Sequence, residues 1–301
     1  MPKNPFEQPI KREEPPIEEM EKKLDKAEKM IERVKEDLKI EEFIEKSVKE
    51  LKKLWEENEE EMRKQRYNSR ASFFFFSSLP LPEAPFFLLE RISNKFLKEF
   101  NWKEFEGKED FETYLGLFLS AFLKKNIENY ISSQKEKDIK EENIKPIEVH
   151  LKVKELPVRL SYLGYQNPKK LHLIVEGNYG IRTGDEMQGG KIIIKGNCKD
   201  CTGGVMSDGE IIVKGNCGHF TGQWMKGGKI IVERNCERGT GEDMEGGELN
   251  IKGEVKSFHK SAFSPNNKGT IIWKGTEIWR NGNWTKEGMK MQERGEIPME
   301  W

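Results

Sequence analysis

The sequence predicts an α plus β-solenoid protein, in which a charged helical region precedes a parallel β-helix with coils of 19 residues. Two observations support this fold class. Residues 1–67 contain 20 acidic and 17 basic residues and no glycine, which is typical of a helix with a solvated face. Of the 27 glycines in the chain, 19 lie between Gly177 and Gly253, and most of these recur with a 19-residue period. Short periods with regular glycines indicate a solenoid. The predicted parts are a charged long helix or coiled coil (1–67), a Phe/Pro-rich linker (68–85), a small helical region (86–144), the β-helix (145–275), and a hairpin cap with a tail (276–301).

The first part has the apolar spacing of a coiled-coil seam. The seam residues alternate three and four apart: Ile17, Met20, Leu24, Ala27, Ile31, Val34 and Leu38. After Leu38 the phase shifts, and the pattern resumes through Ile44, Val48, Leu51, Trp55 and Met62. Three heptads make a short coiled coil. A coiled coil and an amphipathic helix packed on its own chain are therefore equally open interpretations.

The linker is predicted to be non-helical, because Pro80, Pro82 and Pro85 each remove a backbone donor and fix φ. Its Phe73–Phe76 run is very apolar for a linker. Burial against a neighbouring domain and an exposed docking patch are the two interpretations. Two amphipathic helices are then expected near residues 85–100 and 110–132, with a small helical core.

From Ile174 onward the repeat carries one short β run per period, which predicts one coil of a parallel β-helix for each repeat. The predicted strands are Ile192–Ile194, Ile211–Val213, Ile230–Val232 and Leu249–Ile251, with a first strand at Ile147–Leu151 and a further repeat strand, displaced by three residues, at 268–275. Residues 277–285 read as a hairpin that turns at Asn281-Gly282. In that register Trp279 and Trp284 are cross-strand partners, which predicts a C-terminal cap.

The cysteines allow two interpretations. Cys198 and Cys201 form a CxxC motif, which can hold zinc or a redox disulfide. However, Cys198, Cys217 and Cys236 share one column of the repeat, which favours small side chains stacked inside the solenoid. The alternative is a soft-metal site of Cys198, Cys201 and Cys217, with His219 close in sequence. Three further columns of the repeat hold one residue type each: Met187, Met206, Met225 and Met244; Asn178, Asn197, Asn216 and Asn235; and Thr183, Thr202, Thr221 and Thr240. The methionines are expected to fill the core, and the asparagines and threonines to hydrogen-bond turn backbone groups.

One column is predicted to point outward. Asn250 stands where the other repeats carry an isoleucine, so this middle strand position faces away from the lumen. The isoleucines concerned are Ile174, Ile193, Ile212 and Ile231. An apolar surface column of this kind is expected to be covered, by the N-terminal helices of the same chain or by a partner subunit. Trp224 is also expected to be exposed and to serve as a contact residue.

The repeats GDEMQGGKIIIKGNC and TGGVMSDGEIIVKGNC, continued by GHFTGQWMKGGKIIVERNC, resemble the GXGXG family of right-handed β-helices. That family includes the C-terminal domain of the large glutamate synthase subunit and a β-helical subunit of formylmethanofuran dehydrogenase. The resemblance covers roughly residues 160–275. It implies a right-handed β-helix that serves as a non-catalytic scaffold beside redox-active domains or subunits. The helical first half of this chain does not match either relative. The glutamine-hydrolysing and flavin-binding parts of glutamate synthase and the cofactor-binding parts of formylmethanofuran dehydrogenase have no counterpart in this sequence.

Composition narrows the function further. A net charge of −1 argues against general nucleic-acid binding. No apolar run is long enough to span a membrane, the N-terminus lacks a signal-peptide core, and four cysteines fit a reducing, cytoplasmic setting. No catalytic constellation, phosphate loop, cofactor site or small-molecule substrate is indicated. The sequence thus favours a non-catalytic scaffold that binds partner subunits or another copy of itself. The alternative is a non-catalytic subunit of a formylmethanofuran dehydrogenase-like or glutamate synthase-like oxidoreductase complex.

Overall fold

The computed structural model describes residues 17–64, 69–105 and 111–300. The chain separates into two units, Met1–Lys46 and Ser47–Trp301. Helix α1 spans Ile17–Lys64 and contributes to both. In the first unit, Met30, Ile31, Val34 and Leu38 are each between 50% and 68% exposed. The seam positions Ile17, Met20, Leu24 and Ala27 lie outside the residues whose side chains are described, so coiled-coil pairing stays a prediction.

The second unit begins with a small helical core, as predicted. It is built from the end of α1 and from α2 (Ser69–Ser78), α3 (Leu89–Glu99) and α4 (Phe111–Lys135), with short 3₁₀ turns η1 (Phe86–Leu88), η2 (Trp102–Phe105) and η3 (Glu141–Asn143). Trp55 of α1 lies at its centre, with ring centroids 5.5 Å from Phe100 and 5.6 Å from Phe118. Val48 and Leu51 are buried beside it. This part of α1 therefore packs on its own chain.

The prediction of a non-helical linker over residues 68–85 is wrong for α2. The prolines disfavour helix only from the residue before Pro80 onward, so the preceding Ser69–Ser78 segment is free to form helix. Two of its four phenylalanines, Phe73 and Phe76, are buried, and Phe74 is exposed. The Phe73 ring lies 4.8 Å from that of Tyr165, and Phe76 lies 5.6 Å from Phe118. Burial of the run is thus confirmed for two of its residues.

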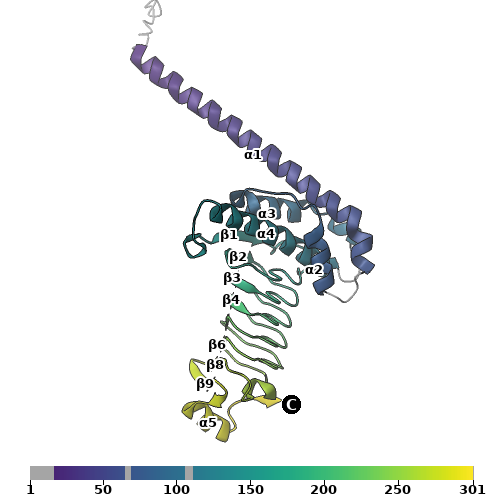
Figure 1. The fold of residues 1–301 in the computed structure, drawn as a ribbon, viewed down its shortest axis with the longest axis vertical. Helices are drawn as coiled ribbons and strands as arrows, with labels where there is room; N and C mark the ends of the chain where they lie inside the picture. Colours follow the sequence, from purple (N-terminus) through teal and green to yellow (C-terminus); the bar gives the residue numbers. More distant parts are fainter. Residues whose placement is uncertain (1–16, 65–68, 106–110, 301) are drawn as a thin grey trace, which may run out of the picture. The chain divides into compact units, whose positions relative to one another are not determined.

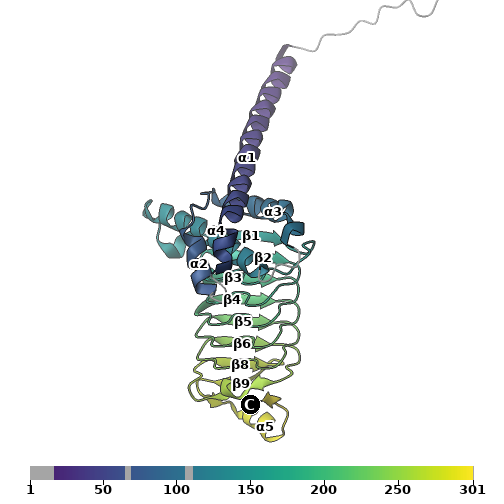
Figure 2. The same ribbon diagram turned by 90° about the vertical axis from the view of Figure 1, so that its right-hand side faces the viewer.

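The rest of the unit is the predicted parallel solenoid, with about five coils (Figures 1 and 2). Its strands are β1 (Ile147–Lys152), β2 (Leu171–Glu176), β3 (Gln188–Ile194), β4 (Asp208–Val213), β5 (Lys229–Val232), β6 (Glu248–Ile251) and β8 (Thr270–Trp273). Each pairs in parallel with the next, and Ile192, Ile211, Ile230 and Leu249 are in register 19 residues apart. Each coil has one regular strand; a second pairing occurs as isolated bridges such as Cys217 with Cys236.

The side opposite the strands is formed by a repeated turn, here named the TG turn: residues 182–187, 201–206, 220–225 and 239–244. Each contains a buried Thr-Gly pair and ends on a buried methionine. Gly203 has a φ of +69°, and a Cβ there would lie 2.4 Å from the Cδ1 of Ile230. Only glycine fits this conformation and this approach. The contact also shows that the TG turns face the strands across the lumen.

Polar ladders along the solenoid satisfy turn backbone groups, as predicted. The Oδ1 of Asn197 accepts the N–H of Asn216 at 2.8 Å, and Asn216 in turn accepts from Asn235 at 3.1 Å. Threonine hydroxyls donate to carbonyls three residues earlier, at 3.2 Å for Thr221 and 2.9 Å for Thr240. Such bonds remove unpaired groups where the chain turns.

Both ends of the solenoid are covered. At the first end, α3 lies along the open edge of β1: the Nδ2 of Asn94 donates to the carbonyl of His150 at 2.6 Å, and its Oδ1 accepts the N–H of Lys152 at 2.9 Å. At the other end, β8 is displaced by three residues as predicted, and β9 (Thr276–Arg280) and β10 (Asn283–Trp284) form the predicted hairpin. Trp279 and Trp284 are cross-strand partners with centroids 5.4 Å apart.

Four short elements of this cap have no counterpart in the sequence-based prediction: β7 (Phe258–His259), η4 (Lys260–Phe263), α5 (Lys286–Glu293) and β11 (Met299–Glu300). Strand β11 pairs in parallel with β7 and returns the C-terminal segment to the last coil.

Candidate interaction surfaces

The outward isoleucines form the outer column: Ile174, Ile193, Ile212 and Ile231. Burial alternates along each strand, and Ile192 and Ile194 are fully buried whereas Ile193 between them is partly exposed. The four members are paired in register from β2 to β5, and the column continues through Asn250 and Ile272. The outward orientation of this column is thus confirmed.

Two charged columns flank the outer column, because residues two positions before and after each isoleucine face the same way. Before the isoleucines, Lys191 pairs with Glu210 at 2.7 Å and Lys229 with Glu248 at 2.9 Å. After them, Glu233 accepts from Lys252 at 2.7 Å and lies 3.4 Å from Lys214. The hydrogen bond from Lys252 lowers the pKa of Glu233. These exposed pairs add little stability individually, but they enclose the apolar column between charged borders.

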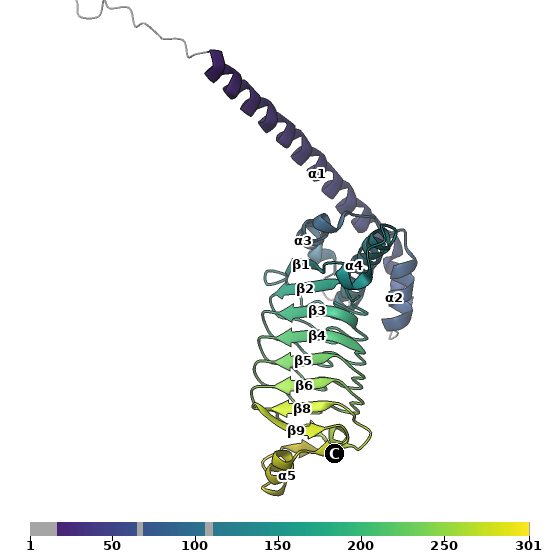
Figure 3. The same cartoon turned by 60° about the vertical axis from the view of Figure 1, so that its left-hand side comes forward.

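The expectation that the helices of this chain cover the outer column is wrong for α2, α3 and α4. Helix α2 packs on the TG-turn side, where the Nε of Arg70 lies 2.5 Å from the Oε1 of Glu186. In Figures 1 and 3, the strands and α2 lie on opposite sides of the solenoid. Helix α3 uses the edge of β1 instead. Within the described residues of the second unit, the helices thus use the TG side and the edge of β1 and leave the face of β3–β6 uncovered.

Trp224 is exposed, as predicted, at 42% of its surface. Its Nε1 donates to the Oδ2 of Asp243 in the next coil at 3.3 Å. Phe220, which the sequence-based prediction omitted, is exposed at 37% in the same TG turn. Both residues have positive φ. Because the TG turns lie across the lumen from the strands, this aromatic pair and the outer column are separate surfaces.

The cysteine column lies inside the solenoid. Cys198, Cys217 and Cys236 are buried, and Cys201 is partly exposed. A hydrogen bond that the Cys198 thiol donates to Cys217, together with burial, raises the pKa of Cys198, so Cys198 has little thiolate character at neutral pH. Within residues 17–64, 69–105 and 111–300, no group of three or more His, Cys, Asp or Glu side chains is arranged to hold a metal ion.

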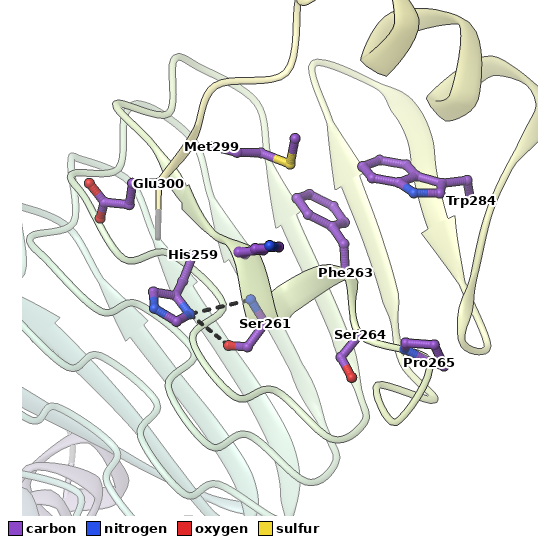
Figure 4. Close-up of a pocket in the computed structure, with 9 residues that line it drawn as sticks. His259, Ser261, Phe263, Ser264, Pro265, Trp284, Met299 and Glu300 are labelled. Atoms are coloured by element: carbon purple, nitrogen blue, oxygen red, sulfur yellow. Dashed lines mark hydrogen bonds between the residues drawn. The ribbon is translucent and has the colours of Figure 1, made fainter.

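An open pocket of about 910 Å³ adjoins the C-terminal cap (Figure 4). It is lined mainly by apolar groups, including Phe263, Trp284 and Met299. The structure also brings together a serine and a histidine that the sequence gives no reason to pair: the Nδ1 of His259 lies 2.7 Å from the Oγ of Ser261. The Nε2 of the same histidine is 3.8 Å from the Oε1 of Glu242.

This Ser-His-Glu arrangement has a structural explanation. In successive coils the fifth residue of each TG turn donates its N–H to a carbonyl of the next coil, as Trp224 does to Glu242 at 2.9 Å. In the last TG turn, the N–H of Asp243 donates to the Oγ of Ser261 instead. His259 also accepts the N–H of Ser261 and caps η4. The pair thus ends the row of hydrogen bonds that links successive TG turns. This bonding pattern does not indicate catalysis.

Comparison with protein families, with curated proteins and with solved structures finds no match for this chain. The resemblance to the GXGXG family therefore stays an expectation from the repeat. Among the helices of the described residues, none combines the length and the apolar character needed to cross a membrane.

Proposed function

We propose that this protein is a non-catalytic assembly protein, and that the outer face of its β-helix binds another protein. The observation that supports the proposal is the outer column from Ile193 to Ile231, a continuous strip of partly exposed isoleucines on one face of the sheet. Contiguous exposed apolar surface is typical of contact sites. Its charged borders give the face the usual layout of an interface, with an apolar centre inside a polar rim.

Two further features support a binding role over a catalytic one. The seam of α1 presents Ile31, Val34 and Leu38 at high exposure, which suits a second contact with a helix. The Ser261–His259 pair in the cap pocket has structural contacts: Ser261 accepts the N–H of Asp243, and His259 caps η4. Two contacts on one chain would strengthen each other through effective concentration, even if each alone is weak.

A second candidate is favoured by the likeness of the repeat to the GXGXG family. In that case the protein bound to the outer face would be a redox-active subunit of an oxidoreductase complex. Both candidates use the same face and differ in the partner. Identification of the proteins that copurify with the native protein separates them.

The test is an Ile212→Glu variant, which places a charge at the centre of the outer column. The matched control is Ile181→Glu, at an isoleucine that is 37% exposed and directly precedes the first TG turn. We expect Ile212→Glu to lose the copurifying protein while its circular dichroism and unfolding midpoint stay close to wild type. Ile181→Glu should retain the complex. If Ile212→Glu folds normally and keeps every bound protein, the proposal is wrong.

A further inference from the structure

We infer that the occupant of the outer face is a second copy of this chain, related by a two-fold axis parallel to the solenoid. This inference rests on the proposed function and names the partner for the same face. It is argued from the order of apolar, polar and charged residues over the successive coils. A rotation about this axis places apolar residues of one copy against apolar residues of the other, and most charged residues against opposite charges.

A two-fold axis parallel to the solenoid places each coil against the same coil of the second copy. Ile193, Ile212 and Ile231 then each face their own equivalents. Asn250 faces the second copy's Asn250, and two side-chain amides can hydrogen-bond to each other. Apolar positions thus meet apolar positions, and the polar position meets its polar equivalent. A single polar residue in an apolar seam is a known way to fix register.

The same rotation places the charged column before the strands opposite the one after them. Glu210 then faces Lys214 of the second copy, Lys229 faces Glu233, and Glu248 faces Lys252. Each pair occurs twice by symmetry. The exception is Lys191, which faces Lys195. All of these side chains lie on the outward face, so the borders of the two copies are complementary over three successive coils.

The other simple two-fold arrangement has its axis parallel to the strands, between β4 and β5. It also pairs opposite charges, for example Lys191 with Glu248. However, it places Asn250 against Ile193 of the second copy, which removes the amide from water without a partner. The axis parallel to the solenoid is therefore favoured, and the strand-parallel arrangement is an outcome that the experiment separates.

The size of the face sets the expected affinity. Five coils at about 4.8 Å and a strand width of about 16 Å give a footprint of about 400 Å² per copy. Stable interfaces use about 800 Å² on each partner. The β-helix dimer is therefore expected to dissociate on dilution in the micromolar range when it acts alone.

The experiment measures the molar mass of the full-length protein by sedimentation equilibrium over a range of concentrations. We expect it to rise from 35.2 kDa towards twice that value. Ile212→Glu should raise the dissociation constant at least about 100-fold and Ile181→Glu leave it unchanged. Glu210→Lys and Lys214→Glu should each raise it about tenfold, because each creates a like-charge pair across the axis.

The combined Glu210→Lys, Lys214→Glu variant is the decisive one. It restores opposite charges between the two copies but not the pairs of these residues with Lys191 and Glu233 inside one chain. We expect its dissociation constant to return to within about threefold of wild type. A double variant as weak as the single variants would overturn the solenoid-parallel axis.

Crosslinking separates the two arrangements. With Cys201→Ser as background, a short bis-maleimide should join two chains through Ile174→Cys alone, because this position lies beside its own equivalent. The strand-parallel axis would instead separate the two Ile174 positions by five strand spacings, about 24 Å, and bring Ile174 beside Ile272 of the second copy. A crosslink formed only when Ile174→Cys is mixed with Ile272→Cys would indicate that axis and overturn the inference. If the protein is monomeric and Ile212→Glu loses a different bound protein, the dimer inference is wrong and the proposed function stands. If Ile212→Glu changes neither dimer formation nor the binding of another protein, both the dimer inference and the proposed function are wrong.

Discussion

The backbone N–H of Asp243 donates to the Oγ of Ser261 at 2.7 Å, at the point where the preceding coils use a backbone carbonyl. Where the next TG turn would follow 19 residues later, the chain forms β7 and η4 instead (Phe258–Phe263), so the ladder lacks its next backbone acceptor there. A serine hydroxyl held by His259 takes the place of that acceptor. This relationship gives a structural reason for the contact of Ser261 with His259 in the cap pocket.

Ser261→Ala should therefore lower the free energy of unfolding by about 1 kcal/mol, because water can partly satisfy the exposed N–H of Asp243. Ser264→Ala, in the same pocket, is the control and should have a smaller effect. Urea unfolding measures both. Labelling of Ser261 by a fluorophosphonate, abolished in Ser261→Ala, would instead mark it as a reactive nucleophile.

Asp185 should make stability depend on pH. Burial raises its pKa to about 7, although Arg182 lies 3.3 Å from its carboxylate. The folded state thus holds this proton more tightly than the unfolded chain does. The stabilisation is full below about pH 4 and is lost as the pH rises through 7. Between pH 4.5 and 8, the free energy of unfolding of Asp185→Asn should therefore decrease by about 2 to 4 kcal/mol less than that of the wild type.

The measurement is the difference in free energy of unfolding between wild type and Asp185→Asn at several pH values. Asp138→Asn, at an exposed position, should keep the wild-type profile. A constant difference between wild type and Asp185→Asn across this range would show that Asp185 does not titrate there.

The cysteines should differ in reactivity. A thiol reagent in excess should modify Cys201 in the native protein and all four cysteines after unfolding, because Cys198, Cys217 and Cys236 are buried. Cys201→Ser should remove the fast phase. Fast modification of the other three in the folded protein, or stoichiometric bound zinc, would contradict their role as core side chains.

Asn94 should protect the open edge of β1. Asn94→Ala leaves the carbonyl of His150 and the N–H of Lys152 without their side-chain partners. We expect a loss of about 1 to 3 kcal/mol in the free energy of unfolding and more aggregation through the freed edge. Lys98→Ala, exposed on the same helix, is the control. Equal stability of the two variants would indicate that α3 does not cap this edge.

The repeat made the solenoid predictable in detail. Leu249 pairs with Ile271 across a displacement of three residues, and Trp279 pairs with Trp284, as the spacing indicates. The period determines which residues stack on each other in successive coils. Because Asn250 is the polar member of the middle column, it identifies that column as outward and its two neighbours as inward. Phe220 was missed because its column also holds arginine, cysteine and glycine, and a mixed column carries no signal.

The irregular parts were less predictable. Helix α2 was not predicted, because the three prolines that follow it suggested a longer non-helical segment than Pro80 imposes. The contact of His259 with Ser261 depends on how the chain leaves the last coil, which no repeat pattern encodes. The packing of α2 on the TG side depends on contacts between residues far apart in the sequence, such as Arg70 with Glu186. The spacing of residues along one segment does not predict such contacts.

Hydroxyl-radical labelling of the assembled protein and of Ile212→Glu tests the central claim, burial of the outer column in a protein contact, most directly. We predict that Ile193 and Ile231 are labelled several-fold less in the assembled wild type than in the variant, whereas Ile181 is labelled equally in both. Equal labelling of Ile193 and Ile231 in the two proteins would contradict the claim that this face binds protein.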